Sequence, residues 1–176
     1  AHDRVIDLLY RLADEGWQDA LTLGVTPVLA AQWDDPYCLA QQHTWLGFWA
    51  TRAAGWGAHA GERQRDLAAG EYRDATAALE RFESRWRHGG SAVLRPLLDS
   101  GVVELLSGPA THAFQPLLAD PMLDFALSTG LQDTQLRTGA PVRGIWAPEC
   151  GFRPGMGRHY ADAGVSHFLL DGPAFE

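Results

Sequence analysis

The sequence predicts an α/β protein with a parallel sheet, and two observations carry that prediction. Short apolar segments recur along the chain, and segments with helical periodicity separate them. The apolar segments also lack strict alternation of polar and apolar residues, which is typical of strands covered on both faces. This pattern fits a (β/α) barrel or a doubly wound open sheet. Because a closed barrel usually has about eight strands, the four expected here would form only part of one.

Four segments are predicted to be strands. They span residues 20–27, 102–108, 142–148 and 165–171, and each is rich in apolar residues. The first, ALTLGVTP, is short, apolar and closed by a proline, so we expect it to be buried.

Helices are predicted between these strands. Residues 4–15 carry apolar side chains at helical spacing, and Thr26 is a candidate N-cap for a helix whose first residue is Pro27. Ser91 is a second candidate cap. Further helices are expected at residues 91–101, 121–138 and 154–164.

A long helical segment occupies residues 36–90 and is expected to contain two or three helices. Its glycines suggest breaks near residues 55, 57, 61 and 70. Four tryptophans fall in this segment: Trp45, Trp49, Trp56 and Trp86. Core packing is the favoured interpretation of these rings. The alternative is that one or two of them face a sugar ligand.

Composition narrows the class of protein. The 176 residues suit one domain with a sizeable core, and the formal charge of -8 argues against nucleic acid as a partner. Seven tryptophans suit a core and also suit the flat apolar faces of carbohydrate. Two cysteines do not make a disulfide framework, and no apolar run approaches the roughly 20 residues of a membrane span. We therefore expect a cytoplasmic protein.

Polar residues follow each predicted strand. They are Thr26 after the first strand, residues 107–114 after the second, residues 146–152 after the third, and Asp171 at the end of the fourth. The carboxyl ends of parallel strands meet at one edge of a sheet, where α/β proteins bind ligands. These four groups are therefore expected to form one site.

Glu149 is the main catalytic candidate at this edge. It follows Pro148, and we expect Trp146 and Phe152 to enclose its carboxylate. A glutamate beside aromatic side chains suits acid/base or covalent chemistry at a sugar. The alternative is a surface carboxylate or an acid at a helix start.

Three other side chains raise similar questions. His112 could be an ordinary loop histidine, but its position favours a bond to a substrate hydroxyl or to a carboxylate. Cys150 is interpreted as a packed thiol rather than a nucleophile. Glu104 lies within an apolar strand and should have a partner, for which Arg143 or Arg153 are candidates. A structural ion pair and a functional role are both open for it.

No motif for a metal or a nucleotide is present. The sequence has no HExxH, no paired CxxC, no GxGxxG and no P-loop. Neither a metal site nor nucleotide binding therefore has support from the sequence.

The segment GIWAPECGFRPG resembles the nucleophile motif of glycoside hydrolase family 57, with Glu149 on its glutamate. GVVELLSGPATHAFQPLL, LTLGVTPVLAAQWDDP and YADAGVSHFLLD resemble other segments of that family, in the same order. A cysteine directly after the glutamate is typical of its 1,4-α-glucan branching enzymes. Ala147, Phe152 and Gln115 depart from the usual residues.

The resemblance implies an incomplete seven-stranded (β/α) barrel and a retaining transglycosylase without a cofactor. Glu149 would form a covalent glycosyl-enzyme with an α-1,4-glucan polysaccharide such as glycogen, and a glucan 6-hydroxyl would accept the chain to form an α-1,6 branch. The substrate-binding residues implied are His112, Trp146, Cys150, Phe152 and Asp171. Alternatives are an α-amylase, a 4-α-glucanotransferase or a non-catalytic glucan-binding protein of this family. A metal-dependent deacetylase on a related barrel is a further possibility.

Two parts of the family pattern are not found. A histidine-rich first motif is expected before Ala1, and the aspartate acid/base is expected beyond Glu176. Residues 1–176 are therefore interpreted as an interior part of the catalytic domain, with the helical segment 36–90 inserted. We expect this piece to be inactive alone.

Overall fold

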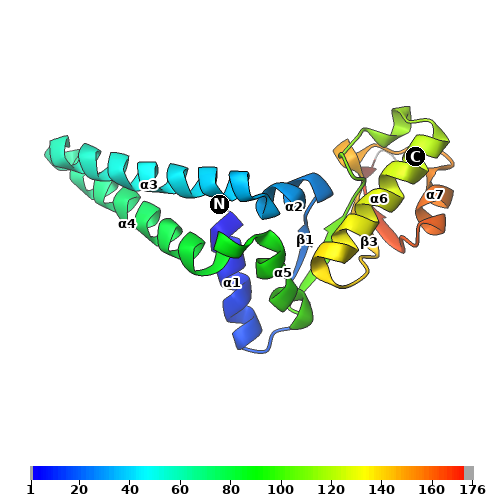
Figure 1. Cartoon of the computed structure of the whole chain (residues 1–176), viewed down its shortest axis with the longest axis horizontal. Helices are drawn as coiled ribbons and strands as arrows, with labels where there is room; N and C mark the ends of the chain where they lie inside the picture. Colours follow the sequence, from blue (N-terminus) through cyan, green and yellow to red (C-terminus); the bar gives the residue numbers. More distant parts are fainter. Residues whose placement is uncertain (1, 173–176) are drawn as a thin grey trace. The chain divides into compact units, whose positions relative to one another are not determined.

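The computed structural model describes residues 2–172 and contains one parallel sheet (Figure 1). All four predicted strands are present, each shorter than predicted, and they lie in the order β1-β2-β3-β4. Their bounds are β1 (Leu21–Gly24), β2 (Val103–Ser107), β3 (Gly144–Trp146) and β4 (His167–Leu169). The α/β class with parallel strands is confirmed.

β1 is more exposed than predicted. Leu21, Thr22 and Gly24 are exposed, whereas four of the five residues of β2 are buried. The cause is position: β1 pairs only with β2 among the described strands, while β2 lies between β1 and β3. An apolar sequence predicts a strand without showing where in the sheet it lies.

The chain divides into two compact units. One contains the chain up to Ile6 and Gln32–Val93, and the other contains Asp7–Ala31 and the chain from Leu94 onward. The first unit is helical, and the second contains the sheet. The first helix, α1 (His2–Asp14), agrees with the prediction for residues 4–15.

The helical unit is built on a hairpin of two long helices, α3 (Pro36–His59) and α4 (Glu62–Arg85) (Figure 1). The predicted breaks at residues 55, 57 and 70 are wrong, because these glycines lie inside the helices and the chain turns only at Ala60 and Gly61. A helical glycine costs only about 1 kcal/mol relative to alanine, which contact between two long helices outweighs. A 3₁₀ turn, η1 (Trp86–His88), follows α4.

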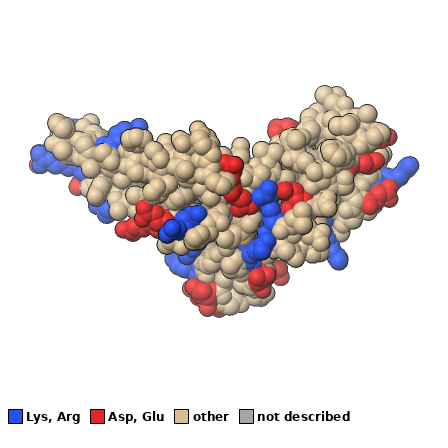
Figure 2. All heavy atoms as spheres, viewed as in Figure 1, with Lys and Arg blue, Asp and Glu red and all other residues tan. Residues whose placement is uncertain are grey.

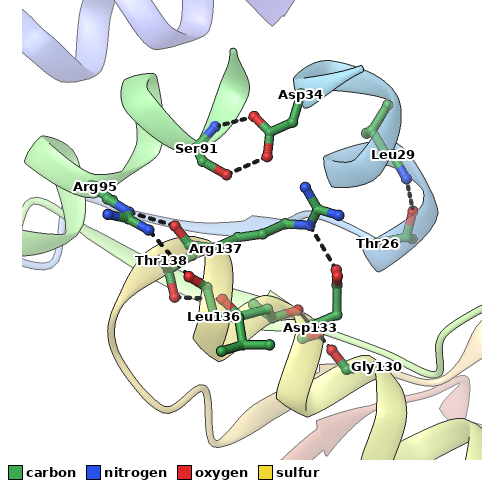
Figure 3. Close-up of polar contacts among 12 residues, drawn as sticks. Thr26, Leu29, Asp34, Ser91, Arg95, Gly130, Asp133, Leu136, Arg137 and Thr138 are labelled. Carbon is green, nitrogen blue, oxygen red and sulfur yellow. Dashed lines mark hydrogen bonds and ion pairs between the residues drawn. The ribbon is translucent and has the colours of Figure 1, made fainter. Parts of the chain in front are cut away.

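One of the two predicted helix caps is confirmed. The Thr26 hydroxyl accepts a hydrogen bond from the Leu29 N–H (3.2 Å) at the start of α2 (Pro27–Asp34), as Figure 3 shows. Ser91 is not the cap of its helix, because α5 (Gly90–Asp99) begins one residue earlier. Instead, the Asp34 carboxylate accepts bonds from the Ser91 N–H (2.9 Å) and hydroxyl. Rules for helix caps use only residues that are near in sequence, so they could not predict a contact with an aspartate 57 residues away.

The core of the second unit lies between the sheet and two helices, α6 (Asp120–Thr138) and α7 (Met156–Asp162). Its buried side chains come from α6, β3, α7 and the segment just before β4: Leu123, Leu127, Ile145, Met156, Tyr160 and Val165. Gly139 ends α6 in a left-handed conformation, which is common for a glycine directly after a helix.

α6 also fixes the loop that follows β2. A side chain at Gly130 would collide with the Gly108 carbonyl and the Ala110 nitrogen, so the helix lies directly against this loop. The Ala110 N–H donates to the Ala126 carbonyl (2.8 Å), and the hydroxyls of Ser107 and Thr134 are 2.7 Å apart. The loop therefore has a defined position.

None of the helices within residues 2–172 has the length and hydropathy to cross a membrane. All 14 basic residues of the chain, histidine aside, are arginines. Figure 2 shows arginine and acidic side chains in small, mixed groups rather than in one patch of a single sign on this face.

Candidate active site

The segments that follow β2, β3 and β4 converge at the carboxyl edge of the sheet. The Ala147 N–H, just after β3, donates to the Leu169 carbonyl of β4 (3.1 Å). The His112 Nε2 atom, in the loop after β2, lies 3.9 Å from Glu149 Oε1. Cys150 contacts Asp171, which lies just after β4. The predicted convergence is therefore found for these three segments. Thr26, after β1, is engaged in capping α2.

Glu149 occupies a tight turn directly after β3. This 3₁₀ turn, η3 (Pro148–Cys150), is closed by bonds from the Cys150 N–H to the Ala147 carbonyl (2.9 Å) and from the Gly151 N–H to the Pro148 carbonyl (3.0 Å). Pro148 is buried and anchors the turn, yet the Glu149 side chain is 76% exposed. The expected enclosure of this carboxylate by Trp146 and Phe152 is not found in the chain as described.

The backbone of this edge is strained. Within residues 2–172, four non-glycine residues have a positive φ, and three of them are His112 (53°), Glu149 (52°) and Cys150 (56°). A left-handed conformation costs a non-glycine residue on the order of 1–3 kcal/mol, and it persists only where the surrounding structure enforces it. Such residues cluster at functional sites. The strain thus marks the same residues as the sequence motifs.

His112 is held with one ring nitrogen buried. Its side chain is about one-third exposed, and its Nδ1 atom is buried without a hydrogen-bond partner among the described residues. The Nε2 atom faces Glu149, at a distance that is too long for a direct hydrogen bond. This geometry suits electrostatic support of the carboxylate, or a bond from Nε2 to a ligand beside it.

Cys150 is held as a thiol. Desolvation by burial raises its pKa, and the hydrogen bond with Asp171 and the charges of Asp171 and Glu149 raise the pKa further. A thiol with a raised pKa is a weak nucleophile, because the thiolate is the reactive form. The structure therefore agrees with the interpretation of Cys150 as a packed thiol, and it links the turn after β3 to the end of β4.

The two aromatic candidates lie in different surroundings. Trp146, the last residue of β3, is exposed. Phe152 packs on the core instead: its ring stacks on Phe168 (centroids 5.5 Å apart) and lies 6.4 Å from Tyr160. Burial raises the pKa of Tyr160 to about 12, and its hydroxyl donates to the buried Gln115 side chain (2.7 Å). Phe152 thus supports the site from beneath.

Phe114 is a residue at this edge that the sequence reasoning missed. A side chain at Gly151 would collide with the Phe114 ring, so this partly exposed ring lies against the chain two residues after Glu149. Phe114 follows His112 by two residues. An aromatic residue so close in sequence to a candidate site residue could have indicated that it belongs to the site. Position 151 must stay a glycine for the ring to lie there.

Glu104 has partners, but they are not the predicted arginines. Its carboxylate accepts a bond from the Thr22 hydroxyl (2.9 Å) and lies 3.0 Å from His167 Nε2. These residues come from β1, β2 and β4, and the His167 ring reaches Glu104 across Gly144 of β3. A side chain at Gly144 would collide with that ring. The contact joins three strands, so no local spacing could predict it.

Arg153, one of the arginines predicted to pair with Glu104, has a different partner. Arg153 contacts Asp120 (2.6 Å), and this bond lowers the pKa of the Asp120 carboxyl. Among residues 2–172, no three or more His, Cys, Asp or Glu side chains are grouped so that they could hold a metal ion.

Comparisons with known proteins point to one family. A sequence model described as glycosyl hydrolase family 57 matches residues 60–175, more than half of the chain. A probable 1,4-alpha-glucan branching enzyme of Mycobacterium tuberculosis is 48% identical over 184 aligned residues, which cover 97% of this chain and 35% of that protein. The chain thus spans about a third of the length of this curated relative.

Two solved structures share the fold. A GH57-type branching enzyme of Pyrococcus horikoshii superposes with a TM-score of 0.85 at 22% identity, covering 99% of this chain and 37% of that one. The alpha-amylase AmyC of Thermotoga maritima gives the same TM-score and identity, covering 97% of this chain and 33% of that one. At this identity the likeness establishes the fold alone.

Proposed function

Because the chain belongs to glycosyl hydrolase family 57, we propose that it is part of a retaining transglycosylase that acts on α-1,4-glucan. The reaction that fits best is branching, in which a cut chain end is transferred to a glucan 6-hydroxyl. The 48% identity with a probable branching enzyme supports this choice over other activities of the family. The active protein is longer than this chain and contains an incomplete (β/α) barrel, of which these strands are an interior part.

The observation that carries the proposal is the geometry around Glu149. Its carboxylate projects from a strained turn at the carboxyl edge of a parallel sheet, with His112 Nε2 3.9 Å away. An exposed carboxylate held on a rigid turn can approach an anomeric carbon that a longer protein and its substrate would place above it. We assign Glu149 as the nucleophile.

In a retaining reaction two carboxylates about 5–5.5 Å apart divide the work. The Glu149 carboxylate attacks the anomeric carbon, and the glycosidic oxygen leaves with a proton from the second group. A 6-hydroxyl of another glucan chain then attacks the glycosyl-Glu149 ester, gives its proton to the second group, and releases the carboxylate. The family resemblance assigns the second group to an aspartate downstream of Glu176.

The neighbouring residues would position the nucleophile and the sugar. Asp171 holds Cys150, and through it the turn that carries Glu149. His112 would support the carboxylate or bond a sugar hydroxyl with Nε2, while the exposed Trp146 offers an apolar face to a sugar ring. Phe152 would act from the core beneath, and Phe114 joins the set as a further wall.

A glucan-branching assay of the full-length protein tests the proposal. Amylose is incubated with the protein, and the product is debranched so that the new α-1,6 linkages can be counted. We expect new linkages with the unmodified protein. Glu149→Gln should lower their rate of formation about a thousandfold or more, because an amide cannot form the glycosyl ester.

Glu80→Gln is the matched control, since Glu80 is an exposed glutamate on α4, in the helical unit rather than in the unit that contains the sheet. It should leave the rate unchanged. If shorter chains or disproportionated chains form without α-1,6 linkages, the protein is an α-amylase or a 4-α-glucanotransferase. Retention of most activity by the Glu149→Gln variant would reject the nucleophile assignment and favour a different catalytic centre. A protein that leaves amylose unchanged and carries a divalent metal in elemental analysis would favour a deacetylase.

A further inference from the structure

A row of tryptophans lies along one face of α3, in the helical unit. Trp45, Trp49 and Trp56 are separated by four and seven residues, so their side chains leave the helix within roughly 60° of one another. The row extends about 16 Å along the helix axis. Trp45 is 57% exposed and Trp56 40% exposed. Core packing, the favoured interpretation of the sequence, therefore does not account for these two rings.

Two cavities adjoin the row and share Trp49. The first has a volume of about 240 Å³, and its walls include the rings of Trp33, Trp45, Trp49 and Trp86. Trp56, Leu67 and Arg52 line the second, of about 490 Å³, together with Trp49. The first volume lies just below and the second within the range of roughly 300–1,000 Å³ that is usual for drug-sized ligands, so each cavity suits one or two sugar rings. Because one ring borders both cavities, they lie next to each other along α3.

The rings are held in place before any ligand binds. The Trp49 Nε1–H donates to the Glu71 carboxylate on α4 (3.0 Å), and the Trp45 and Trp49 rings lie 5.7 Å apart at a tilt of 34°. Arg4 and Asp74 form an ion pair of 2.6 Å at the wall of the first cavity. Fixed aromatic walls bind with little loss of conformational freedom.

The surface of α3 is almost free of charge. Among its 24 residues Arg52 is the single arginine, and there is no Asp or Glu. Acidic and basic side chains concentrate on α4 and at the tip of the hairpin, and most of the surface over α3 in Figure 2 is uncharged. Such a face suits a neutral ligand. A nucleic acid would need a positive groove.

We propose that this row is a second carbohydrate-binding site, which holds an α-glucan chain on the helical unit. The chain's sugar rings would lie on the indole faces of Trp45, Trp49 and Trp56. The side chains of Gln42 and Arg52, in the cavity walls, would bond sugar hydroxyls. The identity of the polymer rests on the proposed function, whereas the site itself rests on the aromatic row.

A site of this kind raises the local concentration of polymer at the enzyme. Binding of one part of a long chain makes the next contact with the same chain effectively intramolecular. The benefit exists only for substrates that are long enough to reach both sites. Binding of a polymer should therefore depend on the tryptophan row, whereas binding of a short oligosaccharide should not.

The experiment uses the full-length protein in native gels that contain glycogen or amylose. We expect the unmodified protein to be retarded, and Trp45→Ala with Trp56→Ala to weaken binding roughly tenfold or more, since each lost ring contact is worth about a fivefold to tenfold change. Phe48→Ala is the matched control, because Phe48 is an exposed aromatic on α3 that lines neither cavity. It should leave retardation unchanged. Phenylalanine at positions 45 and 56 should restore most of the binding.

Kinetics give a second measurement. The double alanine variant should have a raised KM for amylose with an unchanged kcat, and unchanged kinetics with maltoheptaose. Equal retardation of this variant and the unmodified protein would overturn the proposal. An equal loss in Phe48→Ala would also overturn it, as would a double variant that fails to fold, since the row would then be a packing surface for another part of the protein.

Different results would contradict the proposed function and the proposed binding site. Glu149→Gln should abolish turnover while retaining retardation in the gel. If the protein forms no new linkages but is retarded through the tryptophans, the proposed function is wrong and the binding site remains. Turnover without any contribution of the tryptophans to polymer binding would reject the binding site alone.

Discussion

At Glu149 the proposed function needs a carboxylate, whereas the left-handed backbone would be more stable with a glycine. Its φ of 52° and ψ of 26° suit glycine and disfavour every residue with a Cβ atom. Cys150 continues the same conformation, so two neighbouring residues both store strain. A chain selected for stability alone would place glycine here. The carboxylate is retained where the backbone opposes it, which is the pattern expected of a functional residue.

Replacing Glu149 by glycine and by alanine tests this strain. Both variants should lose activity, because neither has a nucleophile. Glycine should nevertheless make the full-length protein more stable than alanine does by about 1 kcal/mol, since the left-handed penalty exceeds the extra entropy of glycine in the unfolded chain. The free energies of unfolding are measured by urea denaturation.

Glu80 on α4 provides the control pair. In the interior of a helix alanine is favoured over glycine by about 1 kcal/mol, so the order of the two variants should be reversed at this position. The same order at positions 80 and 149 would show that Glu149 carries no strain.

The sequence predicted which residues lie at the candidate site better than it predicted how they are arranged. Glu149, His112, Cys150 and Asp171 follow strands that the hydrophobic pattern reveals, and parallel strands bring such residues to one edge. The burial of Phe152 and the place of Phe114 against Gly151 depend on packing between distant segments. Sequence spacing gives no information on such contacts.

At the scale of elements, a glycine in β3 leaves room for a polar contact between the strands on either side of it. Gly144 of β3 pairs with Leu106 on one side and with His167 on the other. Because it has no side chain, the His167 ring can cross it to reach Glu104. The short strand β3 is thus held by the contact between His167 and Glu104 that crosses it, as well as by its own hydrogen bonds.

Gly144→Ala should destabilise the full-length protein by about 1–2 kcal/mol, because the new methyl group must displace the His167 ring and the Leu106 side chain. Thermal or urea unfolding measures the loss. In a His167→Ala background the cost should fall, since part of the collision is then removed. Gly24→Ala in β1 meets no atom within 4 Å and should change stability by less than about 0.5 kcal/mol. A Gly144→Ala cost that is unchanged by His167→Ala would contradict this account.

The elements themselves were predicted to different degrees. Local patterns predicted all four strands and also the helix that begins at Pro27. The glycines of α3 and α4 misled the prediction, because contact between two long helices outweighs a small local preference. Ser91 was wrong as a cap because the acceptor, Asp34, is distant in sequence.

At the scale of the whole molecule, the resemblance to family 57 is confirmed, and it carries information that the fold alone does not. A parallel sheet flanked by helices supports many chemistries. The order of four motifs along the chain, together with 48% identity to a probable branching enzyme, is what narrows the choice. The chain covers about a third of that relative. On the proposed function, the proton donor lies outside these residues.

Residues 1–176 expressed alone should form no α-1,6 linkages above a blank, whereas the full-length protein should form them. The reason is chemical: a retaining transfer needs a proton donor beside the nucleophile, and losing one of the two carboxylates lowers turnover by several orders of magnitude. Asp171 lies near this edge but contacts Cys150, and the family order assigns the donor to a later aspartate. Circular dichroism confirms folding of the piece, and debranched amylose products measure its activity. Turnover by the piece that disappears in Asp171→Asn would identify Asp171 as the proton donor instead.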